Sequence, residues 1–446
     1  MKRRTFLGGS AAAAALAACK DEGDTAAAVA SVDHVIVIMM ENRSFDHFLG
    51  ALALEGMAVD GLTGDETNPD LDGVEQPVFH LDEACQLDPP HGWGDSHGQF
   101  NEGANDGFVR EHQDRVGSEQ GPWVMGYYTR EDLPAHYALA DGFCVPDRFF
   151  CSVMSSTWPN RFYGHTGSSK GVKNNDLPEG GNGIYDQQSI YETLIDAGLG
   201  WRYFYTDAPY IGLLHDHWDP ARIDMIEEFF TRVEDGDLPE FTWIDPGFGW
   251  NDDHPPHHVR AGQMFLALVI EAIARSPLWE KCLILITYDE HGGFFDHVPP
   301  PTTEDDYAAE GFDQMGFRVP ALVIGPWVKQ GVESTVFDNT SVLKYCCDRF
   351  GLTPWTKRIE AANSLGLCLD EQRMADYDPL PPPTIPTFNA PGLDELPDDC
   401  LYRSDGTGQV ELEAWLAENM PENWRRDLTD VKAFFDAKAR EYGLLR

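Results

Sequence analysis

Two short apolar runs, far apart in the sequence, each lead directly into a pair of oxygen-bearing side chains. The run Val32–Met40 is followed by Glu41-Asn42, and the run Cys282–Tyr288 is followed by Asp289-Glu290. Their length and β-branched content predict buried strands. Strands that alternate with helices favour an α/β layer fold with a largely parallel sheet, whose ligands bind beyond the carboxyl ends of the strands.

The rest of the chain supports this alternation. Further strands are predicted over Trp201–Tyr205, Phe241–Ile244 and Val319–Ile324, and helices after the capping residue Ser189 (with Ile190, Leu194 and Ile195 on one face), over His258–Arg275 and over Asn339–Phe350. We expect one catalytic domain over residues 32–375, with a central sheet flanked by helices. Residues 52–130 form a long insertion that shapes the site, and residues 376–446 form a Pro-rich strap and C-terminal helices that pack on the domain.

The N-terminus is predicted to be an export signal rather than part of the fold. Arg3-Arg4 precedes an Ala-rich stretch, Ala11–Ala18, that is too short to span a bilayer. The paired arginines resemble a twin-arginine signal in residues 1–19, and the sequence up to Cys19 resembles a lipoprotein processing site. We expect a periplasmic or cell-surface protein that is anchored to a membrane by lipid on Cys19, with residues 20–31 as a flexible tether; the alternative is an ordinary secretory signal with an incidental cysteine.

The charge of the chain excludes some functions. With 32 Lys plus Arg against 75 Asp plus Glu, the formal net charge is -43. No basic surface is available for nucleic acid, so we expect no nucleic-acid partner. A phosphate substrate would need metal ions or local cations to reverse the field at the site. Export permits disulfides among the other eight cysteines, although Cys282, in an apolar run, is expected to be a free buried thiol.

The strand ends carry donors that suit a hard divalent cation. Glu41, Asn42, Asp289 and Glu290 offer carboxylate and amide oxygens at two neighbouring strand ends. Such ligands fit calcium, manganese or magnesium, and a histidine ligand would widen the choice to iron or zinc. Acidic residues after a strand are also common helix caps and turn formers, which is the alternative for either pair alone.

A third segment supplies a candidate nucleophile. Ser155, Ser156 and Thr157 precede Pro159 at a predicted helix start, where free N–H groups and the helix dipole favour anions. A hydroxyl held there beside a cation loses its proton more easily and can attack phosphorus. Asn160 and Arg161 could then hold phosphate oxygens. A capped helix with a polar first turn is the alternative.

Two histidines in loop-like sequence complete the candidate site. His91 follows two prolines, and His254 lies between acidic residues and prolines. Histidine can bind phosphate oxygens or protonate a leaving alkoxide. The same residues could instead be inert surface histidines.

Together these segments resemble the phosphoesterase family that holds bacterial and plant non-specific phospholipases C and a bacterial acid phosphatase. The resemblance rests on Glu41–Phe48 (ENRSFDHF), Thr157–Arg161 (TWPNR), Asp253–Pro255 (DHP) and Tyr288–Pro300 (YDEHGGFFDHVPP), in that order within residues 32–350. It implies an alkaline-phosphatase-like α/β fold. It also implies Thr157 as nucleophile, His91 and His254 near the phosphate as phosphate binders or proton donor, and Glu41, Asn42, Asp289 and Glu290 as metal ligands.

The expected function is hydrolysis of phospholipids by a phospholipase C mechanism, through a phospho-threonine intermediate. A broad-specificity acid phosphatase that acts on small phosphomonoesters would use the same residues and is the alternative. A non-catalytic, cation-binding surface lipoprotein is a third possibility, but it leaves the order of the hydroxyl, amide and histidine segments unexplained. The sequence leaves the head group, the metal, the disulfide pairing and the oligomeric state open.

Overall fold

The computed structural model describes residues 30–176, 187–214, 219–390, 400, 416–418 and 428–445. The predicted signal, the tether to residue 29 and Cys19 lie outside the described residues, so those predictions stay untested. No helix in the described part of the chain combines the length and the apolar character that crossing a bilayer requires.

An eight-stranded sheet forms the centre of the molecule, in the order β13-β6-β12-β11-β1-β10-β8-β9. All neighbours pair in parallel except β12, which is antiparallel to β11 and β6. The predicted α/β fold with a largely parallel sheet is therefore confirmed. The strands are β1 (His34–Met40), β6 (Cys144–Pro146), β8 (Trp201–Tyr205), β9 (Ile223–Met225), β10 (Phe241–Ile244), β11 (Cys282–Tyr288), β12 (Leu322–Ile324) and β13 (Gly331–Glu333).

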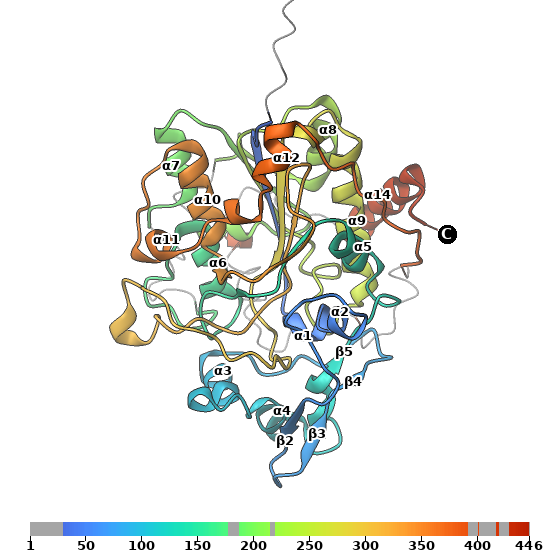
Figure 1. The fold of residues 1–446 in the computed structure, drawn as a ribbon, viewed down its shortest axis with the longest axis vertical. Helices are drawn as coiled ribbons and strands as arrows, with labels where there is room; N and C mark the ends of the chain where they lie inside the picture. The colour runs from blue at the N-terminus through green and yellow to red at the C-terminus, as the bar shows by residue number, and fades with distance from the viewer. Residues whose placement is uncertain are drawn as a thin grey trace, which may run out of the picture.

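Helices cover both faces of this sheet (Figure 1). One layer contains α6 (Thr157–Thr166), α7 (Ile190–Asp196), α10 (Ser341–Phe350) and α11 (Lys357–Ala361). The other contains α5 (Pro134–Gly142), α8 (Ile226–Asp235), the long α9 (Val259–Arg275) and α14 (Leu428–Tyr442), with α12 (Glu371–Asp376) nearby. All seven residues of β11 are buried, because helices shield both of its faces.

Two sequence predictions need correction. The strand predicted over Val319–Ile324 is shorter: Val319 donates its N–H to Phe149 O (2.9 Å) and so leaves the central sheet, and Pro320 has no N–H to donate. On α7, Ser189 and Glu192 form the predicted capping box. Ile195, however, is 47% exposed, since it lies about 100° around the helix from Leu194 and misses the buried face.

The insertion lies beyond the carboxyl end of the sheet, at the bottom of Figure 1. It holds α2 (Ala51–Leu54), the hairpin β2 (Thr67–Pro69) and β3 (Glu75–Pro77), β4 (Phe79–His80), α3 (Trp93–Phe100), α4 (Phe108–Val116) and β5 (Gly126–Tyr127). The short α1 (Phe45–Phe48) joins β1 to it, and β7 (Phe149–Phe150) pairs with β14 (Phe337–Asp338). The insertion therefore covers the carboxyl ends of the central strands β1 and β11.

Candidate active site

The floor of the site is made by the four residues that follow β1 and β11: Glu41, Asn42, Asp289 and Glu290. The two strands are neighbours with Met40 opposite Tyr288, so the residue after each strand lies beside the other. The backbone N–H of Asn42 donates to Asp289 Oδ1 (3.0 Å), and that of Arg43 donates to Glu290 O (3.1 Å). All four floor residues are fully buried. The structure thus brings together the predicted oxygen donors.

Two glycines allow the loops around the floor to approach one another. Gly292 and Gly293 have φ values of 65° and 74°. A Cβ on Gly292 would lie 2.2 Å from Asn42 O, and one on Gly293 would lie 2.6 Å from Pro90 O. Only glycine fits both the left-handed backbone and this contact. These positions let the loop after β11 pack against the loop after β1 and the loop that carries His91.

Thr157 lies against the floor, at the first position of α6. Its Oγ1 donates to Glu41 Oε2 at 3.4 Å. The segment before it is held by Asn160, whose Oδ1 accepts from Val153 N (2.9 Å) and whose Nδ2 donates to the carbonyls of Ser155 (2.9 Å) and Ser156 (3.1 Å). Because Asn160 is occupied by these backbone groups, its visible role is to shape the loop; the prediction that it binds phosphate stays untested.

Arg161 is the cation at the centre of the floor. Its guanidinium lies 2.8 Å from Glu41 Oε1, 2.9 Å from Asp245 Oδ1 and 3.6 Å from Asp289 Oδ2, all fully buried. Asp245 follows β10, the other neighbour of β1, so three adjacent strands end in carboxylates. Arg161 also donates to the carbonyls of Met39 (3.2 Å) and Met40 (3.4 Å). Its predicted contact with phosphate stays untested.

The floor carries more negative charge than its arginine offsets. Burial and the charge of Asp289 hold the pKa of Glu41 well above its usual range, and burial and the same charge do so for Glu290. Among the described residues, Asn42 Oδ1, Asp289 Oδ2 and Glu290 Oε1 are buried oxygens without a hydrogen-bond donor. Since buried acceptors need a partner, this set of oxygens fits a hard divalent cation.

A rim above the floor is formed by Asp88, His91 and His254. One potential ligand atom from each lies within 4.8 Å of the others, which is a spacing that a metal ion can bridge. The rim joins the floor, since His91 Nε2 accepts from Asn42 Nδ2 (3.3 Å) and lies 3.6 Å from Glu290 Oε1. The two predicted histidines are therefore brought to the predicted oxygen donors. One carboxylate and two imidazoles suit a borderline cation such as zinc.

Backbone carbonyls orient both rim histidines. Nδ1 of His91 donates to Pro89 O at 2.6 Å, and Nδ1 of His254 donates to Pro255 O. Each bond leaves Nε2 as the atom that can meet a ligand, a common arrangement for imidazoles that bind metals or phosphates. Burial lowers the pKa of His254 and favours its neutral ring.

Sequence reasoning missed Asp88. It lies three residues before His91, and an Asp-x-x-His spacing in a Pro-rich loop was the available signal. A cavity of about 250 Å³ opens next to this residue. Its lining combines rim residues, the residue before Thr157 and one arginine: Asp88, His91, Gly92, Asp95, Arg115, Ser156, Asn174, Asn175 and Asp176. The cavity therefore offers space for a polar group beside Thr157, the predicted nucleophile.

An ion network between the segments that follow β1 and β11 was also missed. Arg318 donates to Asp296 Oδ1 (2.8 Å) and Asp46 Oδ1 (3.0 Å), and Asp46 Oδ2 accepts from His297 Nδ1 (2.6 Å). Asp46 belongs to the segment after β1, whereas Asp296 and His297 belong to the segment after β11. The network therefore ties together the two segments that supply the floor.

Comparison with known proteins assigns the class. The model of the Phosphoesterase family matches residues 32–353, which include the floor, the rim and Thr157. The chain belongs to the phosphoesterase family, and by this membership it is a hydrolase that acts on phosphoester bonds.

Proteins of known name are similar to this chain in sequence. The chain is similar to non-specific phospholipase C1 of Arabidopsis thaliana, with 35% identity over 334 residues that cover 67% of this chain and 61% of the plant protein. It is also similar to phospholipase C B of Mycobacterium tuberculosis, with 32% identity and 82% of each chain covered. Among solved structures, a phosphonate monoester hydrolase of Agrobacterium radiobacter aligns with 11% identity and a TM-score of 0.41, over 75% of this chain and 77% of that one. A structural similarity of this size adds nothing to the sheet order described above.

Proposed function

We propose that this chain is an exported, metal-dependent phosphodiesterase of the phospholipase C type that uses Thr157 as its nucleophile. The main support is the contact between Thr157 Oγ1 and Glu41 Oε2 at 3.4 Å, at the N-terminus of a buried helix. This places an alcohol beside a group of buried oxygens that fits a cation. The plant and bacterial relatives are named phospholipases C, which favours a phospholipid substrate.

In the proposed mechanism, the hydroxyl of Thr157 loses its proton to solvent, and its Oγ1 bonds to phosphorus while the bond to the alcohol of diacylglycerol breaks. His254, with its ring protonated on both nitrogens, gives the Nε2 proton to the departing oxygen and returns to the neutral ring that keeps its Nδ1 bond to Pro255 O. Water then releases the phosphorylated head group from the phospho-threonine and restores the hydroxyl. A divalent cation held by Glu41, Asn42, Asp289 and Glu290 would lower the pKa of the alcohol and offset charge on the phosphate oxygens.

The N-terminal sequence supports the proposed location. Twin-arginine export followed by lipidation of Cys19 would hold the enzyme at a membrane surface, close to phospholipids. The 250 Å³ cavity beside Ser156 offers space for a head group.

A side-by-side assay tests the proposed activity. Phosphatidylcholine and a soluble phosphomonoester are offered to the same metal-loaded enzyme, and we expect at least about tenfold higher kcat/KM for the phosphodiester, or about 1.4 kcal/mol in transition-state binding. The reverse preference would make the protein an acid phosphatase. Hydrolysis of both substrates that survives in Thr157→Ala would instead rule out the covalent mechanism.

A further inference from the structure

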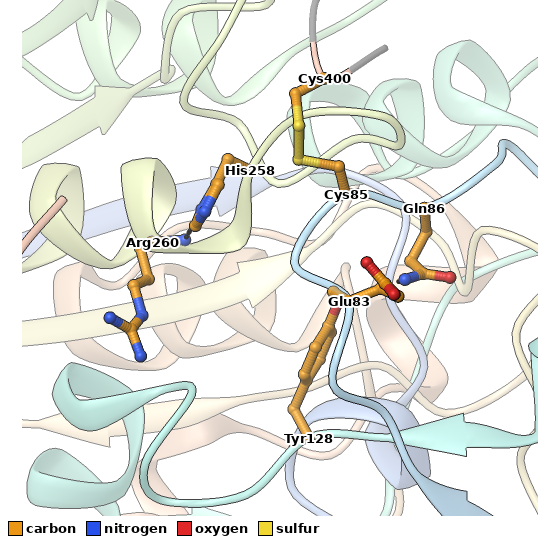
Figure 2. Close-up of a disulfide and its surroundings, with 7 residues drawn as sticks. All are labelled: Glu83, Cys85, Gln86, Tyr128, His258, Arg260 and Cys400. Atoms are coloured by element: carbon orange, nitrogen blue, oxygen red, sulfur yellow. Dashed lines mark hydrogen bonds between the residues drawn. A yellow bond between two sulfur atoms is a disulfide. The ribbon is translucent and has the colours of Figure 1, made fainter. Parts of the chain in front are cut away.

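A disulfide joins the loop that carries the rim to the C-terminal part of the chain. Cys85 is bonded to Cys400, 315 residues away (Figure 2). Cys85 lies three residues before Asp88 and six before His91, in irregular backbone between β4 and α3. Cys400 lies outside residues 32–353, the part of the chain that the family shares.

The disulfide is the last firm attachment of this loop before the rim. Upstream, Tyr128 Oη donates to Glu83 O (2.7 Å) and Val259 N donates to Ala84 O (3.2 Å). In the described part of the chain, no hydrogen bond joins the backbone of residues 86–89 to another element. The next attachment is the bond from Gln99 Nε2 to Pro90 O (2.7 Å). The side chain of Gln86 donates to Glu83 O (3.0 Å), and Pro89 lies against Gly293. Between these two contacts, Leu87 and Asp88 have no backbone hydrogen bond within the described residues.

A hollow lies beside this covalent link. A cavity of about 880 Å³ lies between the upstream part of the loop, the start of α9 and the C-terminal segment. Its lining includes Ala84, Val259, Ala390 and Leu445, one or two from each of these elements. Ala84 itself packs on the main hydrophobic core, but the C-terminal segment faces this part of the loop across the hollow, and the disulfide joins the two covalently.

The same C-terminal region also contacts the second histidine loop. Phe435 of α14 packs against Trp250, with ring centroids 5.9 Å apart, and Trp250 lies four residues before His254. Phe435 also packs on Phe265 of α9 at 5.9 Å. The loop of His254 is thus supported by a packed aromatic group, whereas the loop of His91 is supported by a disulfide.

We infer that the Cys85–Cys400 disulfide is a positioning element for the rim, which makes the proposed phosphodiesterase activity sensitive to reduction. The inference rests on the proposed function only for its effect on turnover. A dithiol that gives two electrons and two protons to the disulfide leaves two protein thiols and a cyclic disulfide of the reagent. Asp88 and His91 then lose one end of their support, while the floor keeps its strands. Misplacement of a site residue by about 1 Å is enough to lower a rate substantially.

The test compares the full-length oxidised protein, the same protein reduced with a dithiol and alkylated after folding, and Cys85→Ser. Hydrogen–deuterium exchange is followed in residues 82–92 and, as internal reference, in residues 34–42. In the reduced protein and in Cys85→Ser, we expect exchange to be faster in residues 82–92 and unchanged in residues 34–42. With a soluble phosphodiester, we expect kcat to fall about tenfold while KM changes less than threefold, because the proposed nucleophile and metal ligands stay in place.

Cys347→Ser is the matched control, since Cys347 is a buried free thiol on α10, away from the loop. This variant should match the untreated protein and keep its response to the dithiol. Unchanged exchange in residues 82–92 after reduction would overturn the inference, and so would equal acceleration in residues 34–42, which marks general destabilisation. If no form hydrolyses any phosphoester, the proposed function fails, and exchange still decides the role of the disulfide.

Discussion

The floor and the rim lie in contact, yet they are built by different means. Floor residues follow directly after β1 and β11, so the register of the sheet fixes where they lie. Rim residues lie on irregular loops that depend on carbonyl contacts, a disulfide and aromatic packing. The floor is wholly buried, whereas His91 is 9% exposed beside the 250 Å³ cavity. The comparison suggests that the floor provides the fixed charge and that the rim meets the substrate.

The largest expected effect is that of removing the hydroxyl of Thr157, the proposed nucleophile, which contacts the floor. Thr157→Ala should lower kcat by about 10⁶-fold, the scale seen when a serine protease loses its nucleophile. Single-turnover kinetics with a soluble phosphodiester measure the loss. Ser156→Ala is the matched control, because Ser156 Oγ is an adjacent buried hydroxyl with no hydrogen-bond partner among the described residues. Similar losses in both variants would point to the shape of the loop rather than to Thr157.

The second largest expected effect is a loss of bound metal when a floor residue is changed. Glu41→Gln removes one negative oxygen, so metal content should fall below half and kcat/KM should drop about 10³-fold, consistent with several kcal/mol of charge stabilisation by a metal. Elemental analysis after dialysis gives the metal content. Asp207→Asn serves as control, because this buried carboxylate accepts from the N–H groups of Phe248 and Gly249 instead. Unchanged metal content in Glu41→Gln would remove Glu41 from the ligand set.

The sequence predicted the floor better than the rim for a physical reason. A strand followed by a carboxylate is a local pattern, and parallel strands bring such patterns to one edge. The rim depends on loops 163 residues apart in sequence, His91 and His254, whose meeting no periodicity encodes. Arg318 shows the same limit, because nothing around it in the sequence indicates contact with Asp46 and Asp296. The disulfide partner of Cys85 could not be deduced from spacing either.

A third prediction separates two roles for the rim. If His254 protonates the leaving group, His254→Asn should slow hydrolysis of an alkyl phosphodiester about 10²-fold but a p-nitrophenyl ester only about threefold, since nitrophenolate leaves without a proton. His258→Asn is the control, because His258 caps α9 and asparagine also caps helices. Equal losses for the two esters, together with loss of metal, would show that His254 is a metal ligand instead.

The smallest expected effect is on the free energy of unfolding, through the ion pair of His297 with Asp46. Burial alone lowers the pKa of His297, but the hydrogen bond to Asp46 and the charges of Asp46 and Asp296 outweigh it and raise the pKa to about 9. A raised pKa stabilises the fold when the ring is protonated, so this contribution is complete below about pH 6.5 and is lost as the pH rises through about 9. With 24% of the side chain exposed, we expect about 2 kcal/mol, less than the full shift would give.

Urea unfolding at pH 6 and pH 9.5 measures this contribution, and His297→Gln should remove most of the difference between the two pH values. His80→Gln is the control, because His80 lies on β4 at the surface and pairs with Asp132, away from the floor. Reduction of the disulfide should leave the pH difference unchanged, since within the described residues Arg318, Asp46 and His297 form no hydrogen bond to the loop of Cys85. If reduction and His297→Gln alter the same pH-dependent stability, floor and rim are one cooperative unit and not two separately supported layers.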